Sequence, residues 1–204
     1  MSAPPRKRVP WVAAAALACL GLIPPGASRA ATATASDRLD ELMQLLSARR
    51  HGRVTFTEVQ HLAILDRPLE SSGELLYDAP DRLEKRTLRP VEETLVLAHG
   101  VLTATRGRHS HSVELAAHPE AAPLVESIRA TLAGDRAALE RVFSVALDGD
   151  LAHWTLTLAP RDSAAAHAVR EVRITGARAG IATVEILQAD GDRSVLTLGP
   201  EASS

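Results

Sequence analysis

The stretch that decides the fold is Phe56-Thr57-Glu58, followed by Gly73-Glu74-Leu75-Leu76-Tyr77-Asp78-Ala79-Pro80-Asp81-Arg82-Leu83. It predicts two long strands joined by a turn and a third strand entered through Pro80, because apolar alternation is interrupted by turn residues. Apolar alternation continues through most of the remaining chain, and no catalytic constellation accompanies it. The pattern therefore predicts a β-rich shell that encloses something apolar without reacting with it.

The first thirty residues have the layout of a secretory signal. A basic region at 6–8 precedes an apolar run at 11–23 that is short for a membrane span. Prolines and a glycine end this run, and small residues before Ala30 suit a signal peptidase. We expect residues 1–30 to be removed near Ala30 and residues 31–204 to form a single domain; a retained N-terminal anchor is the alternative.

The sole cysteine, Cys19, lies inside the apolar run. Lipidation there is disfavoured because Ala16 stands where a lipoprotein signal would have leucine. Removal of residues 1–30 would leave a chain without cysteine, and its 19 basic and 25 acidic residues would give a net charge of −6. A mildly acidic chain without a basic patch is a poor binder of nucleic acid or anionic membrane.

Helical periodicity occurs in three places. Ser36 is the expected N-cap of a helix over residues 37–50, whose apolar face carries Leu39, Leu42, Met43 and Leu46. A second apolar stripe spans residues 124–132, and Asp135 can cap a short helix after it. These segments predict one N-terminal helix and one inserted helix pair.

The remaining segments predict strands of a long antiparallel meander. Turn residues separate them, and Asp148-Gly149-Asp150 and Asp190-Gly191-Asp192 are expected hairpin turns because glycine and aspartate tolerate positive φ. The expected strands lie near residues 53–65, 72–77, 82–88, 93–97, 101–105, 109–115, 154–158, 172–174 and 184–186. A sheet this long curls, so its apolar face either folds onto itself or leaves a cavity beneath the inserted helices.

The quoted stretch resembles the periplasmic outer-membrane lipoprotein carrier family, LolA, in its divergent branch. The family has an aromatic-Thr-Gln/Glu strand, a Gly-acidic-apolar strand leading to proline, and then an apolar strand; here these are 56–58, 73–77 and 80–84. The later segments match in order, through Leu156-Thr157-Leu158-Ala159-Pro160 to Asp190-Gly191-Asp192-Arg193-Ser194.

The resemblance implies an α+β, mostly antiparallel fold: an open, incomplete β-barrel with an N-terminal helix and a helical lid over an apolar cavity. It implies a periplasmic monomer that carries lipoprotein or glycolipid acyl chains between an inner-membrane donor and an outer-membrane acceptor. Two departures bear on the cargo. Ala79 replaces the arginine with which the family latches its lid, a role that Arg82 or Arg67 could take over. The aromatic side chains after residue 30 number only four.

The apolar patterns and the resemblance together indicate a set of cavity and lid residues, although the stripe at 124–132 could be ordinary core. They are Phe56, Leu75, Tyr77, Leu83, Leu95, Leu97, Leu124, Ile128, Leu132, Trp154, Leu156, Val184 and Ile186.

We expect no enzyme, no cofactor and no metal site. His109 and His111 lie on the same side of one strand but lack a specified third ligand, so an exposed hairpin is favoured. The Asp-Gly-Asp triplets lack the glutamate of a calcium loop. Three functions stay open: a periplasmic carrier of lipid or lipoprotein, a lipid-sensing regulator on the same fold, and an assembly or structural subunit of the envelope.

Overall fold

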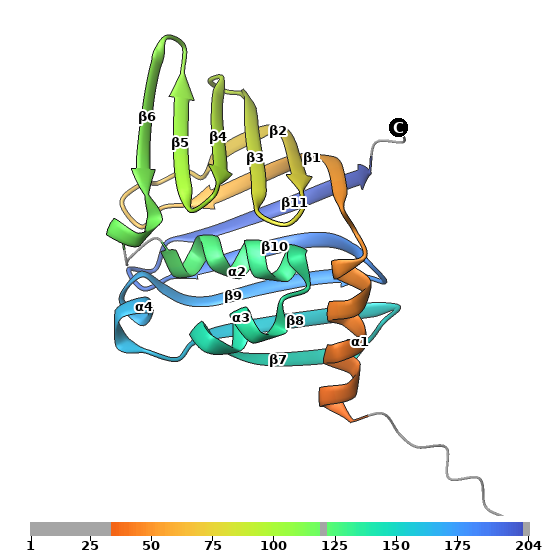
Figure 1. Cartoon of the computed structure of the whole chain (residues 1–204). Helices are drawn as coiled ribbons and strands as arrows, with labels where there is room; N and C mark the ends of the chain where they lie inside the picture. The colour runs from red at the N-terminus through yellow and green to blue at the C-terminus, as the bar shows by residue number, and fades with distance from the viewer. Residues whose placement is uncertain (1–33, 119–121, 202–204) are drawn as a thin grey trace, which may run out of the picture. The chain divides into compact units, whose positions relative to one another are not determined.

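An antiparallel sheet of 11 strands organises the part of the chain that the structure describes (Figure 1). The structure is a computed structural model, and it describes residues 34–118 and 122–201. The expected signal, residues 1–30, lies outside these ranges and stays a prediction. The strand order is β6-β5-β4-β3-β2-β1-β11-β10-β9-β8-β7, so β1 is central and β6 and β7 are the edges.

The strands form two meanders, β1 to β6 and β7 to β11, which β1 and β11 join through pairs such as Phe56 with Leu198. The first six strands are β1 His51–His61, β2 Leu69–Asp78, β3 Arg82–Arg89, β4 Glu93–Ala98, β5 Val101–Arg106 and β6 His109–Glu114. The other five are β7 Phe143–Asp150, β8 His153–Pro160, β9 Val169–Ala177, β10 Gly180–Gln188 and β11 Arg193–Glu201. The sheet is strongly curved, and β3 to β6 run across the direction of β7 to β10 (Figure 1).

One expected turn is confirmed and one is displaced. Gly191, at a φ of 98°, turns the chain between β10 and β11 as expected. Gly149 instead pairs with Trp154 inside the β7–β8 ladder, and the reversal falls at residues 151–152. The reason is local: the Asp150 carboxylate accepts hydrogen bonds from the backbone N–H groups of Ala152 and His153, which draws the turn past the glycine.

Helix α1, Ala35–Ser47, buries the four apolar residues expected of it. The expected cap is wrong, because Thr34 caps the helix and Ser36 lies inside it. Thr34 Oγ1 accepts from the Asp37 N–H at 3.1 Å, and Asp37 accepts from the Thr34 N–H at 2.9 Å. This reciprocal capping box satisfies two backbone donors, whereas a cap at Ser36 would satisfy one.

The inserted pair is α2 Ala122–Ala133 and α3 Arg136–Val142, with Asp135 as the N-cap of α3 as expected. Gly134 joins them at a φ of +64°, and a Cβ there would lie 2.1 Å from the Met43 carbonyl oxygen. Only glycine therefore fits where the helix junction meets α1. Two short helices, η1 Leu115–Ala117 and α4 Ser163–Ala168, were not predicted because segments this short show no period.

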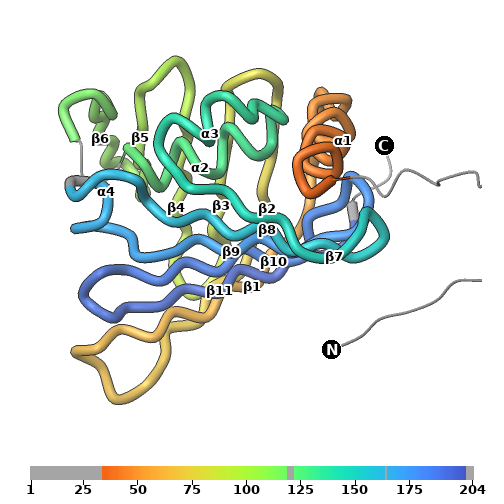
Figure 2. Tube along the Cα trace, turned by 90° about the horizontal axis from the view of Figure 1, so that it is seen from below, coloured from red at the N-terminus to blue at the C-terminus, as the bar shows by residue number. Residues whose placement is uncertain are grey.

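The hydrophobic core lies between β7 to β10 and helices α1 to α3, which all lie on one side of these strands (Figure 2). Alternate residues of β8 and β9 point into it, and α1 and α3 supply the opposite wall. Its fully buried large side chains include Leu42, Leu139, Phe143, Leu156, Leu158, Val172 and Ile174. The core therefore fills one half of the sheet's covered face.

Candidate functional site: an apolar cavity beneath α2

The other half of the covered face encloses a cavity of about 400 Å³ between α2 and strands β1 to β5 and β9 to β11. Its wall is mainly leucine, isoleucine and valine. Ten of the predicted residues line it: Leu75, Tyr77, Leu83, Leu95, Leu97, Leu124, Ile128, Leu132, Val184 and Ile186. A pocket of roughly 300–1,000 Å³ is typical for a drug-sized ligand, so this cavity is of ligand-binding size.

Three predicted residues do not line the cavity. Trp154 and Leu156 belong to the packed core, where 2% and 0% of their surfaces are exposed. The alternation of apolar and polar residues along this strand predicts that Trp154 and Leu156 face inward. It does not predict whether that face meets the packed core or the cavity. Phe56 is also buried, and the Nζ of Lys85, a residue that does line the cavity, lies over its ring at 5.1 Å from the ring centre.

Other residues of the cavity were not predicted from the sequence. Ser194, Leu196 and Leu198 on β11 line the cavity, and their period of two was the available signal. The rest lie on β1, β2, β3, β5, α2, β9 and β10, with Arg49 just after α1. They are Arg49, Gly52, Val54, Glu58, Gln60, Leu76, Glu84, Lys85, Leu102, Val125, Thr131, Ile174, Ile181 and Gln188.

A polar cluster centred on Glu58 interrupts this apolar wall. Each carboxylate oxygen of Glu58 accepts two hydrogen bonds, and only 8% of the side chain is exposed. Oε1 accepts from Ser194 Oγ at 2.7 Å and Gln60 Nε2 at 3.1 Å. Oε2 accepts from Lys85 Nζ at 2.5 Å and Ser71 Oγ at 3.2 Å. The buried carboxylate is thus fully satisfied, as a buried charge requires.

The cluster also determines the protonation state of Glu58. Burial acts to raise the pKa of this carboxyl, but the Lys85 ammonium, aided by Ser194 and Gln60, outweighs burial and holds the pKa below its usual value. Glu58 is therefore charged at neutral pH, and Lys85 balances its charge.

We expect Glu58→Gln to lower the free energy of unfolding by about 1–2 kcal/mol at pH 7, because Lys85 loses its charged partner. A carboxyl with a depressed folded-state pKa contributes stability above its unfolded pKa and loses it as the pH falls through the folded pKa. The difference between the two proteins should therefore shrink between about pH 5 and pH 3. Urea unfolding at several pH values checks this.

The control is Glu74→Gln. It removes a carboxylate that is bonded to Arg53 on the exposed face of the β1–β2 hairpin, the hairpin to which Glu58 also belongs. An exposed pair contributes little, so this variant should stay within about 0.5 kcal/mol of wild type. A Glu58→Gln deficit that is constant from pH 7 to pH 3 would contradict the charge assignment.

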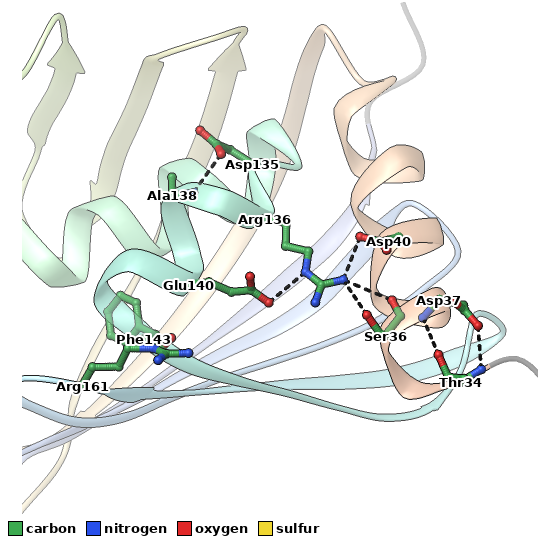
Figure 3. Close-up of polar contacts among 10 residues, drawn as sticks. All are labelled: Thr34, Ser36, Asp37, Asp40, Asp135, Arg136, Ala138, Glu140, Phe143 and Arg161. Carbon is green, nitrogen blue, oxygen red and sulfur yellow. Dashed lines mark hydrogen bonds and ion pairs between the residues drawn. The ribbon is translucent and has the colours of Figure 1, made fainter.

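Helices α2 and α3 are held in different ways. Arg136 at the start of α3 donates to the Ser36 carbonyl at 3.2 Å, Ser36 Oγ at 3.1 Å and Asp40 Oδ1 at 2.8 Å, which ties α3 to α1 (Figure 3). At the other end, Arg161 Nε donates to the Phe143 carbonyl at 2.7 Å (Figure 3). Helix α3 is therefore anchored at both ends.

Helix α2 lacks such anchors among the described residues. Its side-chain hydrogen bonds and ion pairs stay within the helix or reach Asp135, as for Arg129, which pairs with Glu126 at 2.7 Å. Its fully buried residues are small: Ser127, Ala130 and Thr131, and both hydroxyls bond to carbonyls of α2 itself. Among the described residues, lifting α2 would therefore expose little large apolar core and would separate one polar pair, the 3.7 Å contact between Arg129 and Asp135.

Residues 30–204 match the family model described as outer membrane lipoprotein carrier protein LolA-like. The chain belongs to this LolA-like family. The description names a carrier and not an enzyme. Its open, 11-stranded antiparallel sheet with an N-terminal helix and a helical insertion is the LolA-like open barrel.

Solved structures resemble the chain at low identity. A LolA superfamily protein from Nitrosomonas europaea is 10% identical, with a TM-score of 0.46 over 84% of this chain and 94% of that one. A DUF1329 family protein from Desulfovibrio piger is 9% identical, with a TM-score of 0.49 over 83% and 93%. A chain of the Pseudomonas aeruginosa MucA/MucB complex is 15% identical, with a TM-score of 0.43 over 83% of this chain and 59% of the matched chain. No curated protein matched the sequence.

The position where LolA proteins are expected to carry a latch arginine is occupied by Ala79, whose N–H donates to the Arg50 carbonyl at 2.8 Å. Arg82, a suggested substitute, bonds instead to Glu84 at 2.8 Å on its own strand. Tyr77, two residues before Ala79, lines the cavity, and its hydroxyl has no hydrogen-bond partner among the described residues. Burial raises the pKa of Tyr77, so this hydroxyl remains a neutral donor.

Two further observations concern other functions. His109 and His111 are exposed on the edge strand β6, and no cluster of three metal-ligating side chains occurs within residues 34–118 and 122–201. Across the same ranges, no helix is both long enough and apolar enough to span a membrane.

Proposed function

We propose that this LolA-like protein is a periplasmic carrier that shields the acyl chains of a lipoprotein or exported lipid during transfer toward the outer membrane. The observation that carries the proposal is the apolar cavity of about 400 Å³ beneath α2, a helix whose side chains make no hydrogen bond or ion pair to the sheet within residues 34–118 and 122–201. An inner-membrane donor would load the chain, α2 would close over it, and an outer-membrane acceptor would receive it.

The energetics favour reversible carriage. Burial of one methylene contributes about 0.8 kcal/mol, so roughly fifteen methylenes give on the order of 12 kcal/mol before the costs of ordering. Several fully buried chains would approach the practical limit of about 18–21 kcal/mol, from which release would be slow. A cavity near the small end of the ligand-pocket range favours one enclosed chain, with any others left partly outside.

The test is lipid extraction and mass spectrometry of the protein purified from the periplasm of a Gram-negative host. A carrier should yield a stoichiometric acyl lipid that is lost from a variant with a filled cavity, such as Leu95→Trp. Protein free of lipid but bound to another polypeptide would instead favour the assembly-subunit alternative. Intact mass in the same preparation tests export: loss of about thirty residues is expected, whereas a full-length cytoplasmic protein or a diacylated Cys19 would contradict it.

The alanine at position 79 leads to a prediction about α2. Charge-assisted hydrogen bonds from an arginine contribute roughly 1.5–3 kcal/mol, so their absence should raise the open population of α2 about tenfold or more. We expect amide hydrogens of residues 122–133 to exchange much faster than those of β1, and Ala79→Arg to slow them if carbonyls of α2 are within reach.

Ala137→Arg is the control, because residue 137 lies on the exposed side of α3. If wild-type α2 is already as protected as β1 and Ala79→Arg changes nothing, closure does not depend on position 79.

A further inference from the structure

Lys85 occupies an unusual place for a charged side chain, in the middle of the apolar cavity wall. On β3 it pairs with Leu75 of β2 and Leu95 of β4, both of which line the cavity. Its ammonium is fixed between the Glu58 carboxylate, 2.5 Å away, and the face of the Phe56 ring. A lysine that served only solubility would extend toward water, so this one is held at the cavity.

The hydrogen-bonding capacity of the pair is unequal. Both oxygens of Glu58 already accept two hydrogen bonds each. An ammonium carries three donors, and among the described residues Lys85 donates only to Glu58. Its side chain is 27% exposed and lines the cavity. The cluster therefore offers donors, and hardly any acceptor, to a molecule in the cavity.

We propose that Lys85, held in place by Glu58, binds the carbonyl oxygen of an ester or amide at the head of the enclosed acyl chain. This inference rests on the proposed function, since it presumes that the cavity receives acyl chains. It makes the cavity selective for acyl esters and amides over plain or ether-linked hydrocarbon.

The charge balance favours a neutral acceptor over an anion. Glu58 neutralises Lys85, so a carboxylate or phosphate bound at Lys85 would bring a second negative charge close to the Glu58 carboxylate, in a cluster whose other described members, Ser71, Gln60 and Ser194, are uncharged. A charge without a partner in apolar surroundings is strongly disfavoured, and like charges repel. A neutral carbonyl accepts a hydrogen bond from the ammonium without either cost.

A matched pair of probes tests the proposal: 1-palmitoylglycerol, which has an ester carbonyl, and 1-O-hexadecylglycerol, which has the same chain length and hydroxyls but an ether link. Each is used to displace the apolar dye N-phenyl-1-naphthylamine from the protein purified from the periplasm. We expect the ester to compete about tenfold or more better than the ether, because only the ester has a carbonyl oxygen that projects from the chain toward the charged donor, whereas the ether oxygen lies within the chain between two methylenes.

The variant Lys85→Met with Glu58→Gln should abolish this preference while still binding the dye. It should fold, because a buried ion pair is often replaced by uncharged residues of similar size without loss of stability; melting followed by circular dichroism checks this. The control, Arg53→Met with Glu74→Gln, removes an ion pair from the exposed face of the β1–β2 hairpin. It should keep the preference for the ester over the ether.

The outcomes separate the two claims. Dye binding with equal displacement by ester and ether in the wild-type protein would overturn the role of Lys85 and leave the carrier function standing. That comparison needs no variant, so it decides the matter even if the double variant fails to fold. Loss of the preference in the exposed-face control as well would also overturn the assignment to Lys85. If the wild-type protein binds neither the dye nor either of the two lipids, the proposed function itself is overturned.

Discussion

Ile128→Glu should reduce acyl-chain binding at least a hundredfold while the protein remains folded. Ile128 lines the cavity from α2, and a carboxylate without a partner on an apolar wall costs several kcal/mol. Because α2 has no polar anchor to the sheet among the described residues, it can move aside and place the charge in water. Dye displacement by 1-palmitoylglycerol measures the loss, and circular dichroism shows whether the fold survives.

Ala137→Glu is the matched control, since it adds the same charge to the exposed side of the anchored helix α3. It should bind lipid as the wild-type protein does. If Ile128→Glu unfolds the protein outright, the apolar stripe of α2 is structural core, and α2 is not a removable cover.

Phe143→Ala should lower the free energy of unfolding by about 3–5 kcal/mol. Phe143 is fully buried where α3 passes into β7, and Arg161 fixes its backbone. Removing its ring would leave a void in a core that α1 and α3 cannot refill, because Arg136 holds the two helices together. Urea unfolding measures the change.

Ile128→Ala provides the comparison, because the wall of an existing cavity loses few packing contacts. We expect it to cost about 1 kcal/mol, well below the value for a tightly packed position. Equal losses at positions 128 and 143 would contradict the division of the sheet into a packed half and a hollow half.

The fold was largely predictable because its signals are local. The alternation in Trp154, Leu156 and Leu158 marked a buried strand face, and the stripe from Leu124 to Leu132 marked a helix; both are confirmed. The division of the apolar face into core and cavity was not predictable. It depends on where α1 and α3 cross the sheet, which is set by contacts between residues about 100 positions apart, such as Arg136 with Ser36 and Asp40.

The polar cluster shows the same limit. Glu58 stood within the stretch that decides the fold, and Lys85 was noticeable as the lysine that remains after residue 30. Nothing local pairs them, because their strands are separated by β2 and Lys85 must reach across the Phe56 ring. Gly73 contributes to this arrangement: it sits at a bulge where a Cβ would lie 1.8 Å from the Arg86 carbonyl oxygen, so the strands approach closely only with glycine there.

The central claim, that acyl chains lie in the cavity beneath α2, is tested most directly by photolabelling with a 1-palmitoylglycerol that carries a diazirine near the end of its acyl chain. Peptide mass spectrometry of the labelled protein should place the label on cavity residues such as Leu83, Leu95 and Ile128, and excess unlabelled 1-palmitoylglycerol should suppress it. Label confined to exposed apolar side chains, such as Ile64 on the β1–β2 loop, would contradict the account.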